Sequence, residues 1–574
     1  MEQNNTISPN LLIYEELNKI AVHFKDKTAI ICQGKEINYN EFFVLVNNYA
    51  AILDEYKINA YDFVVIQMER CIQMVALMFA LIKTGATFYL AKKDDVVRYE
   101  SLVRALPPTL VITISSEKTL QINNYGISRK YPFLCETAYI FSTSGSTGNP
   151  KTILTSYESF INTIQTLPNA FHFNNEDCIG ALSDVAFDVF LTETIIALCV
   201  GMKVVLFTEL ECKQLRLLML LIKEQRVTVL QTVPSRLRMI SYLDPELRQL
   251  DVVQKIYLGG EKVTQGLVRK LKEKISARVF HIYGTTEDSI WTCISEINEK
   301  MEIEIGCLIE GHCLELLNEN GRNVAVGELG CIYLSGKGLF QGYLEELLIN
   351  DEKPTANRKF CTGDYAITTK DNKIFILGRK DNMVKIQGHR IELEEIESVT
   401  KSIENIAEAV AKAYQNLNED WIICLYYKSD TDIDESVIVN ELKSKLPKSA
   451  IPKLFFHIED FEYLPSGKIN RNNPQFKSLY DEHKSSIVFN KEDAAKTVCS
   501  IIAELCGYRS DEIKTSDPIS KYEITSIIFI KFIIECEKKF SIQFENEALD
   551  VELYSTIDDL LKYILMRVKN GNKR

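Results

Sequence analysis

Residues 139–151, with the sequence YIFSTSGSTGNPK, combine glycines, hydroxyl side chains and a lysine in the way that a polyanion-binding loop requires. Gly145 and Gly148 allow positive φ and a close backbone approach, and the hydroxyl and N–H groups can donate to phosphate oxygens. Lys151 adds a positive charge. A Walker phosphate loop needs glycine directly before its lysine, and Pro150 stands there instead. Taken alone, the stretch is equally consistent with a solvated turn.

Further polar blocks follow this loop in order along the chain. They are Tyr283-Gly-Thr-Thr-Glu287, Cys361-Thr-Gly-Asp364, Gly378-Arg-Lys-Asp381 with Lys385-Ile-Gln-Gly-His-Arg-Ile-Glu392, and Leu464-Pro-Ser-Gly-Lys-Ile-Asn-Arg471. With the first loop, their content and order resemble the motifs of the adenylate-forming superfamily, in particular the adenylation domain of nonribosomal peptide synthetases. The resemblance covers residues 14–471.

The resemblance implies a reaction in which ATP activates a carboxylic acid. Joining a carboxylate to the α-phosphate of ATP brings anions together, so the site needs cations, a metal and donors aimed at the phosphorus oxygens. Three residues are implied as catalytic. Lys468 would bridge the substrate carboxylate and the phosphate, Thr286 would donate a hydrogen bond to the α-phosphate, and Glu287 would hold Mg²⁺.

The resemblance also assigns a set of ATP-binding residues. They are Thr143, Ser144, Gly145, Ser146, Thr147, Gly148, Lys151, Gly260, Glu261, His281, Tyr283, Asp364 and Arg379. Tyr283 would lie along the adenine, and Asp364 would accept hydrogen bonds from both ribose hydroxyls. His281 stands where many relatives carry asparagine, so a structural role is equally consistent. Outside its block, each of these charged residues would ordinarily be a solvated surface charge.

Asp381 fits the hinge about which the small C-terminal unit of such enzymes rotates. That rotation lets one active site perform adenylation and then thioester formation. From the sequence alone, Asp381 is equally consistent with a turn former.

The block Ala186-Phe-Asp-Val189 resembles the segment whose aspartate pairs with the α-ammonium group of an amino acid. A buried Asp188 carboxylate would need a cation, and the substrate would supply it. The alternative is an aspartate that only starts a helix, and the usual serine two residues later is Phe190 here. The predicted substrate pocket comprises Asp188, Val189, Thr192, Gln231, Tyr257, Gly259, Ile282, Ile290 and Trp291, which favours a small or medium side chain that can be polar.

Residues 517–544 resemble a peptidyl or acyl carrier domain, with Ser526 as the attachment site of 4′-phosphopantetheine. Carriers usually show Asp-Ser-Leu preceded by Leu-Gly, whereas this chain has Thr525-Ser-Ile527. A serine at a helix start is a favourable place for a phosphodiester. It is also the ordinary place of an N-cap.

Hydrophobic periodicity predicts an α/β protein of several parts. Helices are expected at 14–23, 39–53 and 72–84, and strands at 28–32, 63–67 and 110–114, an alternation typical of doubly wound parallel sheets. The predicted domains are an adenylation core with a small β subdomain over 1–378, an α+β C-terminal subdomain over 379–474, a linker over 475–490 and a four-helix carrier bundle over 491–574.

Composition excludes several other classes of protein. The net charge of −13 without a long basic block argues against nucleic acid as a partner. No apolar run approaches the ~20 residues of a membrane span, and the N-terminus lacks a signal peptide, so a cytoplasmic protein is expected. Seven histidines without H-x-x-x-H spacing argue against a protein-bound zinc.

The sequence therefore predicts an amino acid adenylating ligase that uses ATP, Mg²⁺ and 4′-phosphopantetheine and loads its own carrier. Its expected partners are an amino acid, a phosphopantetheinyl transferase and downstream enzymes of nonribosomal peptide or antibiotic biosynthesis that act in trans. Two alternatives stay open. One is a ligase for an aryl or acyl acid, and the other is an inactive carrier-binding scaffold, for which Thr285 in place of proline and Thr152 in place of glycine are the signals.

Overall fold

The computed structural model describes residues 8–92, 95–115, 119–126, 131–143, 151–300, 302–350, 358–379, 383–386, 389–415, 421–429, 431, 433–462, 469–471, 473–506, 508–509, 512–522, 524, 526–540, 544 and 554–571. The chain divides into two compact units. The first comprises 1–402, 411–423 and 442–452, and the second comprises 403–410, 424–441 and 453–574.

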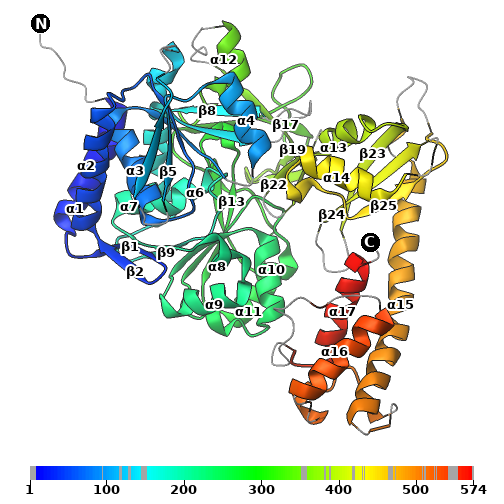
Figure 1. Cartoon of the computed structure of the whole chain (residues 1–574). Helices are drawn as coiled ribbons and strands as arrows, with labels where there is room; N and C mark the ends of the chain where they lie inside the picture. Colours follow the sequence, from blue (N-terminus) through cyan, green and yellow to red (C-terminus); the bar gives the residue numbers. More distant parts are fainter. Residues whose placement is uncertain are drawn as a thin grey trace, which may run out of the picture. The chain divides into compact units, whose positions relative to one another are not determined.

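Two large sheets dominate the first unit (Figure 1). The nine-stranded sheet has the order β15 (Cys307–Leu308), β14 (Cys293–Ile297), β13 (Arg278–Tyr283), β12 (Lys255–Leu258), β11 (Val229–Thr232), β9 (Cys178–Ala181), β10 (Lys203–Leu206), β1 (Thr28–Cys32) and β2 (Lys35–Asn38). The seven-stranded sheet has the order β18 (Gly342–Tyr343), β8 (Lys151–Ser156), β7 (Thr137–Thr143), β4 (Thr87–Leu90), β3 (Phe63–Ile66), β5 (Leu110–Ile114) and β6 (Leu120–Asn124). The inner strands of both sheets run parallel, which confirms the predicted doubly wound α/β class.

Both faces of the sheets are covered, which explains the continuous apolar runs of their strands. In β3, Val64 and Ile66 join the central core, and Phe63 and Val65 join a core on the opposite face. The central core is built from both sheets with α1 (Pro9–His23), α2 (Tyr39–Glu55), α3 (Ile72–Thr84), α5 (Tyr157–Ala170) and α7 (Ala197–Val200). The outer faces are covered by α4 (Val96–Ala105), α8 (Glu209–Lys213), α9 (Leu215–Glu224), α10 (Pro234–Leu243), α11 (Gln265–Lys274) and α12 (Leu344–Asn350).

Helix α3 shows how local and tertiary signals agree. Residues 74–82 are all buried, so its apolar sequence belongs to a helix inside the protein. It ends at Gly85, which adopts the left-handed conformation with φ of 78° that glycine reaches without a Cβ penalty. The predicted helix 72–84 is confirmed residue for residue.

A smaller antiparallel sheet follows in the chain, as predicted for a β subdomain. Its order is β16 (His312–Leu317), β17 (Gly330–Gly336), β19 (Phe360–Thr368) and β20 (Ile374–Arg379). A two-stranded hairpin comes next, formed by β21 (Met383–Ile386) and β22 (His389–Glu392), and it leads into α13 (Leu393–Lys401).

The C-terminal part contains a three-stranded sheet of β23 (Ile406–Gln415), β24 (Trp421–Ser429) and β25 (Leu454–His457), with α14 (Glu435–Lys445) between the last two strands in the chain. Beyond it, α15 (Pro474–Cys506), the 3₁₀ helix η7 (Ile519–Tyr522), α16 (Ser526–Phe540) and α17 (Ile557–Gly571) share one hydrophobic core. Helix α15 runs over the segment predicted as a linker. That this helical segment joins two domains stays a prediction.

Candidate active site

The predicted phosphate loop connects two antiparallel strands, β7 and β8. Thr143 at the end of β7 lies opposite Lys151 at the start of β8. Ser144, Gly145, Ser146, Thr147 and Gly148 fall outside the described residues. Strand β18 pairs with β8 and so places Tyr343 beside Lys151, whose Nζ lies 5.5 Å from the centre of the tyrosine ring. The sequence analysis did not select Tyr343.

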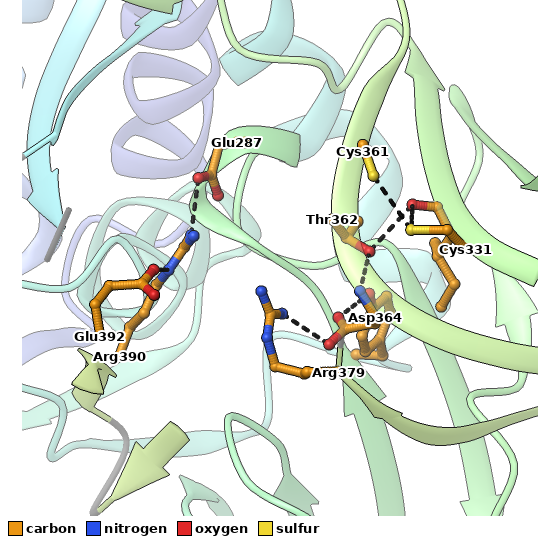
Figure 2. Close-up of polar contacts among 10 residues, drawn as sticks. Glu287, Cys331, Cys361, Thr362, Asp364, Arg379, Arg390 and Glu392 are labelled. Atoms are coloured by element: carbon orange, nitrogen blue, oxygen red, sulfur yellow. Dashed lines mark hydrogen bonds and ion pairs between the residues drawn. The ribbon is translucent and has the colours of Figure 1, made fainter. Parts of the chain in front are cut away.

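Glu287, the residue predicted to hold Mg²⁺, lies in the 3₁₀ helix η4 (Thr286–Asp288), and its side chain is 1% exposed. Its Oε1 accepts hydrogen bonds from the Tyr343 hydroxyl at 3.0 Å and from Arg390 Nη1 at 2.9 Å. Arg390 comes from β22 and also contacts Glu392 (Figure 2). The second oxygen, Oε2, is buried and has no partner. One oxygen of Glu287 is thus held while the other can accept a cation.

Asp364 is the residue predicted to bind the ribose, and both of its carboxylate oxygens accept hydrogen bonds from other side chains. The Tyr283 hydroxyl donates to Oδ2 at 2.7 Å, and Arg379 Nη1 donates to Oδ1 at 2.8 Å. Strand pairing brings these groups together, because Asp364 on β19 lies opposite Arg379 on β20. Burial and the nearby Asp364 charge raise the pKa of Tyr283. A ribose would have to share or replace these two donors.

Two cysteines lie beside this site. Cys361 directly precedes Thr362, whose hydroxyl accepts from the Asp364 N–H at 3.0 Å. The Sγ atoms of Cys361 on β19 and Cys331 on β17 are 3.2 Å apart (Figure 2). Neither cysteine is in a disulfide.

Two further residues predicted to bind ATP, Glu261 and His281, have hydrogen-bond partners within the protein. Glu261 accepts from the N–H and the hydroxyl of Ser235, both at 2.9 Å, and so caps the start of α10. Gly260 has a φ of +77°. His281 lies 2.7 Å from the Glu304 carbonyl through Nδ1, and burial lowers its pKa, which keeps the ring neutral. These contacts support the structural role that the sequence left open for His281.

Asp188 is 5% exposed and stands directly before the short helix α6 (Val189–Leu191). Its Oδ2 has no hydrogen-bond partner. Burial raises its pKa to about 7, and the adjacent Thr286 side chain partly opposes this shift. Among the residues that the structure describes, no lysine or arginine forms an ion pair with it. Its side chain makes no usual cap hydrogen bond to the helix. The backbone N–H of Val189 is nevertheless among the groups that lower its pKa, so the helix-start alternative stays open.

Strand register brings four of the nine predicted pocket residues to one face of the nine-stranded sheet. Gln231 lies opposite Tyr257, and Tyr257 lies opposite Phe280. Gly259 and Ile282 follow two residues later, on the same face because side chains alternate along a strand. Tyr257 belongs to the core rather than to a polar wall. Its ring is stacked between Phe171 and Phe280, and its hydroxyl donates to the Phe171 carbonyl.

Two further groups were missed by the sequence analysis. The first is Glu193, which is fully buried and lies in the π-helix η2 (Thr192–Ile196). Burial raises the pKa of Glu193 to about 7. The second is Lys385 on β21, whose pKa is lowered by burial against the attraction of Asp364. Each residue had a signal in the sequence. Glu193 is the single charged residue in the largely apolar run 189–200, and Lys385 opens one of the motif blocks.

Three assigned roles cannot be placed. Lys468 and the predicted hinge Asp381 lie outside the described residues. Ser526 begins α16, as expected for a serine at a helix start, but its side chain is not among those described. Within the described part, no group of three or more His, Cys, Asp or Glu side chains could hold a metal ion. Nor does any helix there have the length and apolar character to cross a membrane.

Comparisons with known proteins agree with this architecture. The family model of AMP-binding enzymes matches residues 17–94 and 132–344, and that of the phosphopantetheine attachment site matches 496–564. Gramicidin S synthase 2 of Brevibacillus brevis is 30% identical over 493 residues, which are 82% of this chain and 11% of that protein. Tyrocidine synthase 1 of Brevibacillus parabrevis is 27% identical over 594 residues, or 98% of this chain and 53% of that one. The chain thus spans about half of the length of the second relative and about a tenth of the length of the first.

A solved structure shares the fold over nearly the whole chain. Holo-PA1221, described as an NRPS protein containing adenylation and PCP domains, has a TM-score of 0.70 at 19% identity and covers 97% of this chain and 98% of its own. The family match extends over more than half of the residues, and the carrier match lies C-terminal to it. The chain therefore belongs to the AMP-binding enzymes, the adenylate-forming ligases, and carries a phosphopantetheine-type carrier domain after its adenylation region.

Proposed function

We propose that the chain activates an amino acid with ATP as the aminoacyl adenylate and then transfers the aminoacyl group to 4′-phosphopantetheine on Ser526. The observation that carries the amino-acid part is the buried Asp188 carboxylate, with one oxygen unpartnered and a pKa near 7. An uncompensated buried charge is costly, and the α-ammonium group of an amino acid would neutralise it. An aryl or fatty acid has no such group.

In the first step, an oxygen of the amino acid carboxylate attacks the α-phosphorus of ATP, and the bond to pyrophosphate breaks. Thr286 and Lys468 would donate to the oxygens that gain charge, and Lys151 would hold the outgoing phosphates. Asp364, with Arg379 beside it, would orient the ribose.

The residues present fit a magnesium ion delivered with ATP. Mg²⁺ is usually bound by one or two protein carboxylates together with substrate phosphates, and the unpartnered Oε2 of Glu287 supplies one such oxygen. When bound, Mg²⁺ neutralises phosphate charge. Tyr343 and Arg390 orient Glu287 by holding its other oxygen.

In the second step, the pantetheine thiol attacks the aminoacyl carbonyl and AMP leaves. The arm would be attached to Ser526 by a phosphopantetheinyl transferase. Asp381 would serve as the hinge between the two reactions. The loaded carrier would then serve other enzymes of nonribosomal peptide or antibiotic biosynthesis in the cytoplasm.

ATP–pyrophosphate exchange over a panel of amino, aryl and fatty acids tests the first step. We expect exchange with an α-amino acid, and its loss in Asp188→Ala. Exchange with an aryl acid that survives Asp188→Ala would overturn the assignment in favour of an aryl ligase. For the second step, intact-mass analysis of the pantetheinylated protein should detect the aminoacyl group, while Ser526→Ala should keep exchange and lose loading.

A further inference from the structure

The two cysteines beside Asp364 are close enough to form a disulfide. The Sγ atoms of Cys331 on β17 and Cys361 on β19 are 3.2 Å apart (Figure 2). A disulfide holds its sulfur atoms about 2.0 Å apart, so the bond would close with a shift of about 1.2 Å. The two thiols therefore form a candidate site of reversible oxidation.

These cysteines lie at opposite ends of a bulge in β19. At one end, Cys361 lies opposite Tyr333 on β17. At the other end, Tyr365 lies opposite Cys331, so residues 362–364 stand against a single residue of β17. The glycine at the centre of the bulge has a φ of +78°. A bond between the two thiols would link the start of the bulge to the strand opposite its end.

Hydrogen bonds of Thr362 hold the bulge in its present shape. Its hydroxyl donates to the Ile332 carbonyl at 3.1 Å and accepts from the Asp364 N–H at 3.0 Å. Thr362 is buried, and it follows Cys361 directly in the chain. A movement of Cys361 toward Cys331 would shift Thr362 first and, through it, the backbone of Asp364.

The two thiols differ in their access to solvent. Cys361 is exposed, whereas Cys331 is only 7% exposed. An external reagent can therefore reach Cys361, and exchange with a disulfide needs an accessible thiolate. A hydrogen bond with Cys361 raises the pKa of the neighbouring Tyr333, so this hydroxyl is placed to donate to a Cys361 thiolate. Cys361 is thus suited to attack first, and Cys331 to complete the disulfide.

We propose that Cys331 and Cys361 form a reversible disulfide that weakens ATP binding, with a small-molecule disulfide such as oxidised glutathione as the oxidant. The inference goes beyond the proposed function, which gives neither cysteine a role. It rests on that function in one respect, because Asp364 is taken to orient the ribose.

The reaction is a thiol–disulfide exchange in two steps. The Cys361 thiolate attacks one sulfur of oxidised glutathione, the S–S bond of the reagent breaks, and a glutathione thiolate leaves. Cys331 then loses its proton, attacks Cys361 Sγ and displaces the second glutathione. The two protein thiols give up two electrons and become one disulfide. Oxidised glutathione takes up these electrons and the two protons and becomes two molecules of glutathione.

The full chain in glutathione buffers provides the first test. Mass spectrometry of peptides should detect the Cys331–Cys361 disulfide, and its amount should follow the ratio of oxidised to reduced glutathione. The Kd for ATP, measured by calorimetry, should rise about tenfold in the oxidised protein, because displacement of a positioning group by about 1 Å is costly. Dithiothreitol should restore the original Kd.

Three results would overturn the inference. They are the absence of this disulfide in excess oxidised glutathione, a disulfide that leaves the Kd for ATP unchanged, and a loss of ATP binding that dithiothreitol does not reverse. Failure of the proposed function has a different signature. The reduced protein would then show no ATP–pyrophosphate exchange with any amino acid, while its ATP binding would still respond to glutathione.

Serine variants test the order of the two steps. Cys331→Ser should keep one glutathionyl group on Cys361, because no second thiol is present to displace it. Cys361→Ser should gain no glutathionyl group at Cys331, since that thiol is buried. Cys313→Ser removes another exposed thiol, on β16, and is the matched control. It should still form the disulfide and lose ATP affinity. Glutathione on Cys331 in the Cys361→Ser protein, or no response in Cys313→Ser, would contradict the assigned pair.

Discussion

Replacing Asp188 by asparagine should stabilise the substrate-free protein at neutral and alkaline pH while it abolishes amino acid activation. The buried carboxylate has a pKa of about 7 in the folded protein, against an ordinary value of 3.8. Asparagine has nearly the same shape and never carries the charge. The substitution therefore removes the electrostatic cost of the site together with its function.

The magnitude follows from the two pKa values. Below about pH 4 Asp188 is neutral in both states and contributes no penalty. As the pH rises toward 7, the unfolded chain ionises while the folded chain does not, so folding stability is lost, and the loss is complete above pH 7. A difference of about three pKa units at 1.36 kcal/mol each corresponds to about 4 kcal/mol.

Urea unfolding followed by tryptophan fluorescence at several values between pH 5 and pH 8.5 would measure this difference. The free energy of unfolding of Asp188→Asn, minus that of the wild type, should grow with pH and level off above 7. An aminoacyl sulfamoyl adenosine, which is a non-reactive mimic of the aminoacyl adenylate, should reduce the difference by supplying an ammonium group to the wild type.

Asp184→Asn is a matched control four residues earlier. Asp184 forms an ion pair with Lys92 at 2.6 Å, so its substitution should destabilise the protein. If the Asp188→Asn difference were flat between pH 5 and pH 8.5, the buried and uncompensated state of Asp188 would be refuted.

Three further outcomes are expected. The KM for the amino acid should fall as the pH rises from 6 to 8 in steady-state exchange, because ammonium binding needs ionised Asp188, and a KM that is constant over this range would contradict the pairing. Arg379→Ala should raise the KM for ATP about tenfold, since a charge-assisted hydrogen bond that orients Asp364 is lost. Arg379→Lys keeps the positive charge but not the planar guanidinium group, so it should recover part of the lost affinity for ATP. Diamide, a two-electron oxidant, should convert the neighbouring thiols of Cys331 and Cys361 into a disulfide, detected by mass spectrometry of peptides, and should weaken ATP binding; Cys361→Ser should show neither effect.

The sequence predicted those parts of the fold that depend on local patterns. Helix 72–84 was predicted to the residue because an apolar run ends at a glycine that can adopt positive φ. Strand 28–32 was predicted equally well, since its β-branched residues lie between polar neighbours. The length of α15 was not predicted, because residues 475–490 are polar and show little helical periodicity.

The candidate site was predicted as a set of residues but not as a set of contacts. Glu287 was selected from its motif, whereas its bond to Arg390 joins positions 103 residues apart and depends on how β22 lies in the first unit. Glu193 belongs to no motif. It accepts a hydrogen bond from Gln231, which lies 38 residues away, and no pattern within either segment indicates that they meet. Such pairings are set by tertiary packing.

The π-helix over Thr192–Ile196 also affects how this chain should be aligned with its relatives. A π turn holds one more residue than an α turn, and such turns occur mostly as single-turn interruptions of ordinary helices. Deleting one residue there would let the helix close into regular α geometry, and the residues before and after the turn would keep nearly their present orientation, because the π turn holds its extra residue within a single turn. An alignment that places a gap elsewhere in this helix would assign the wrong side chains to the site.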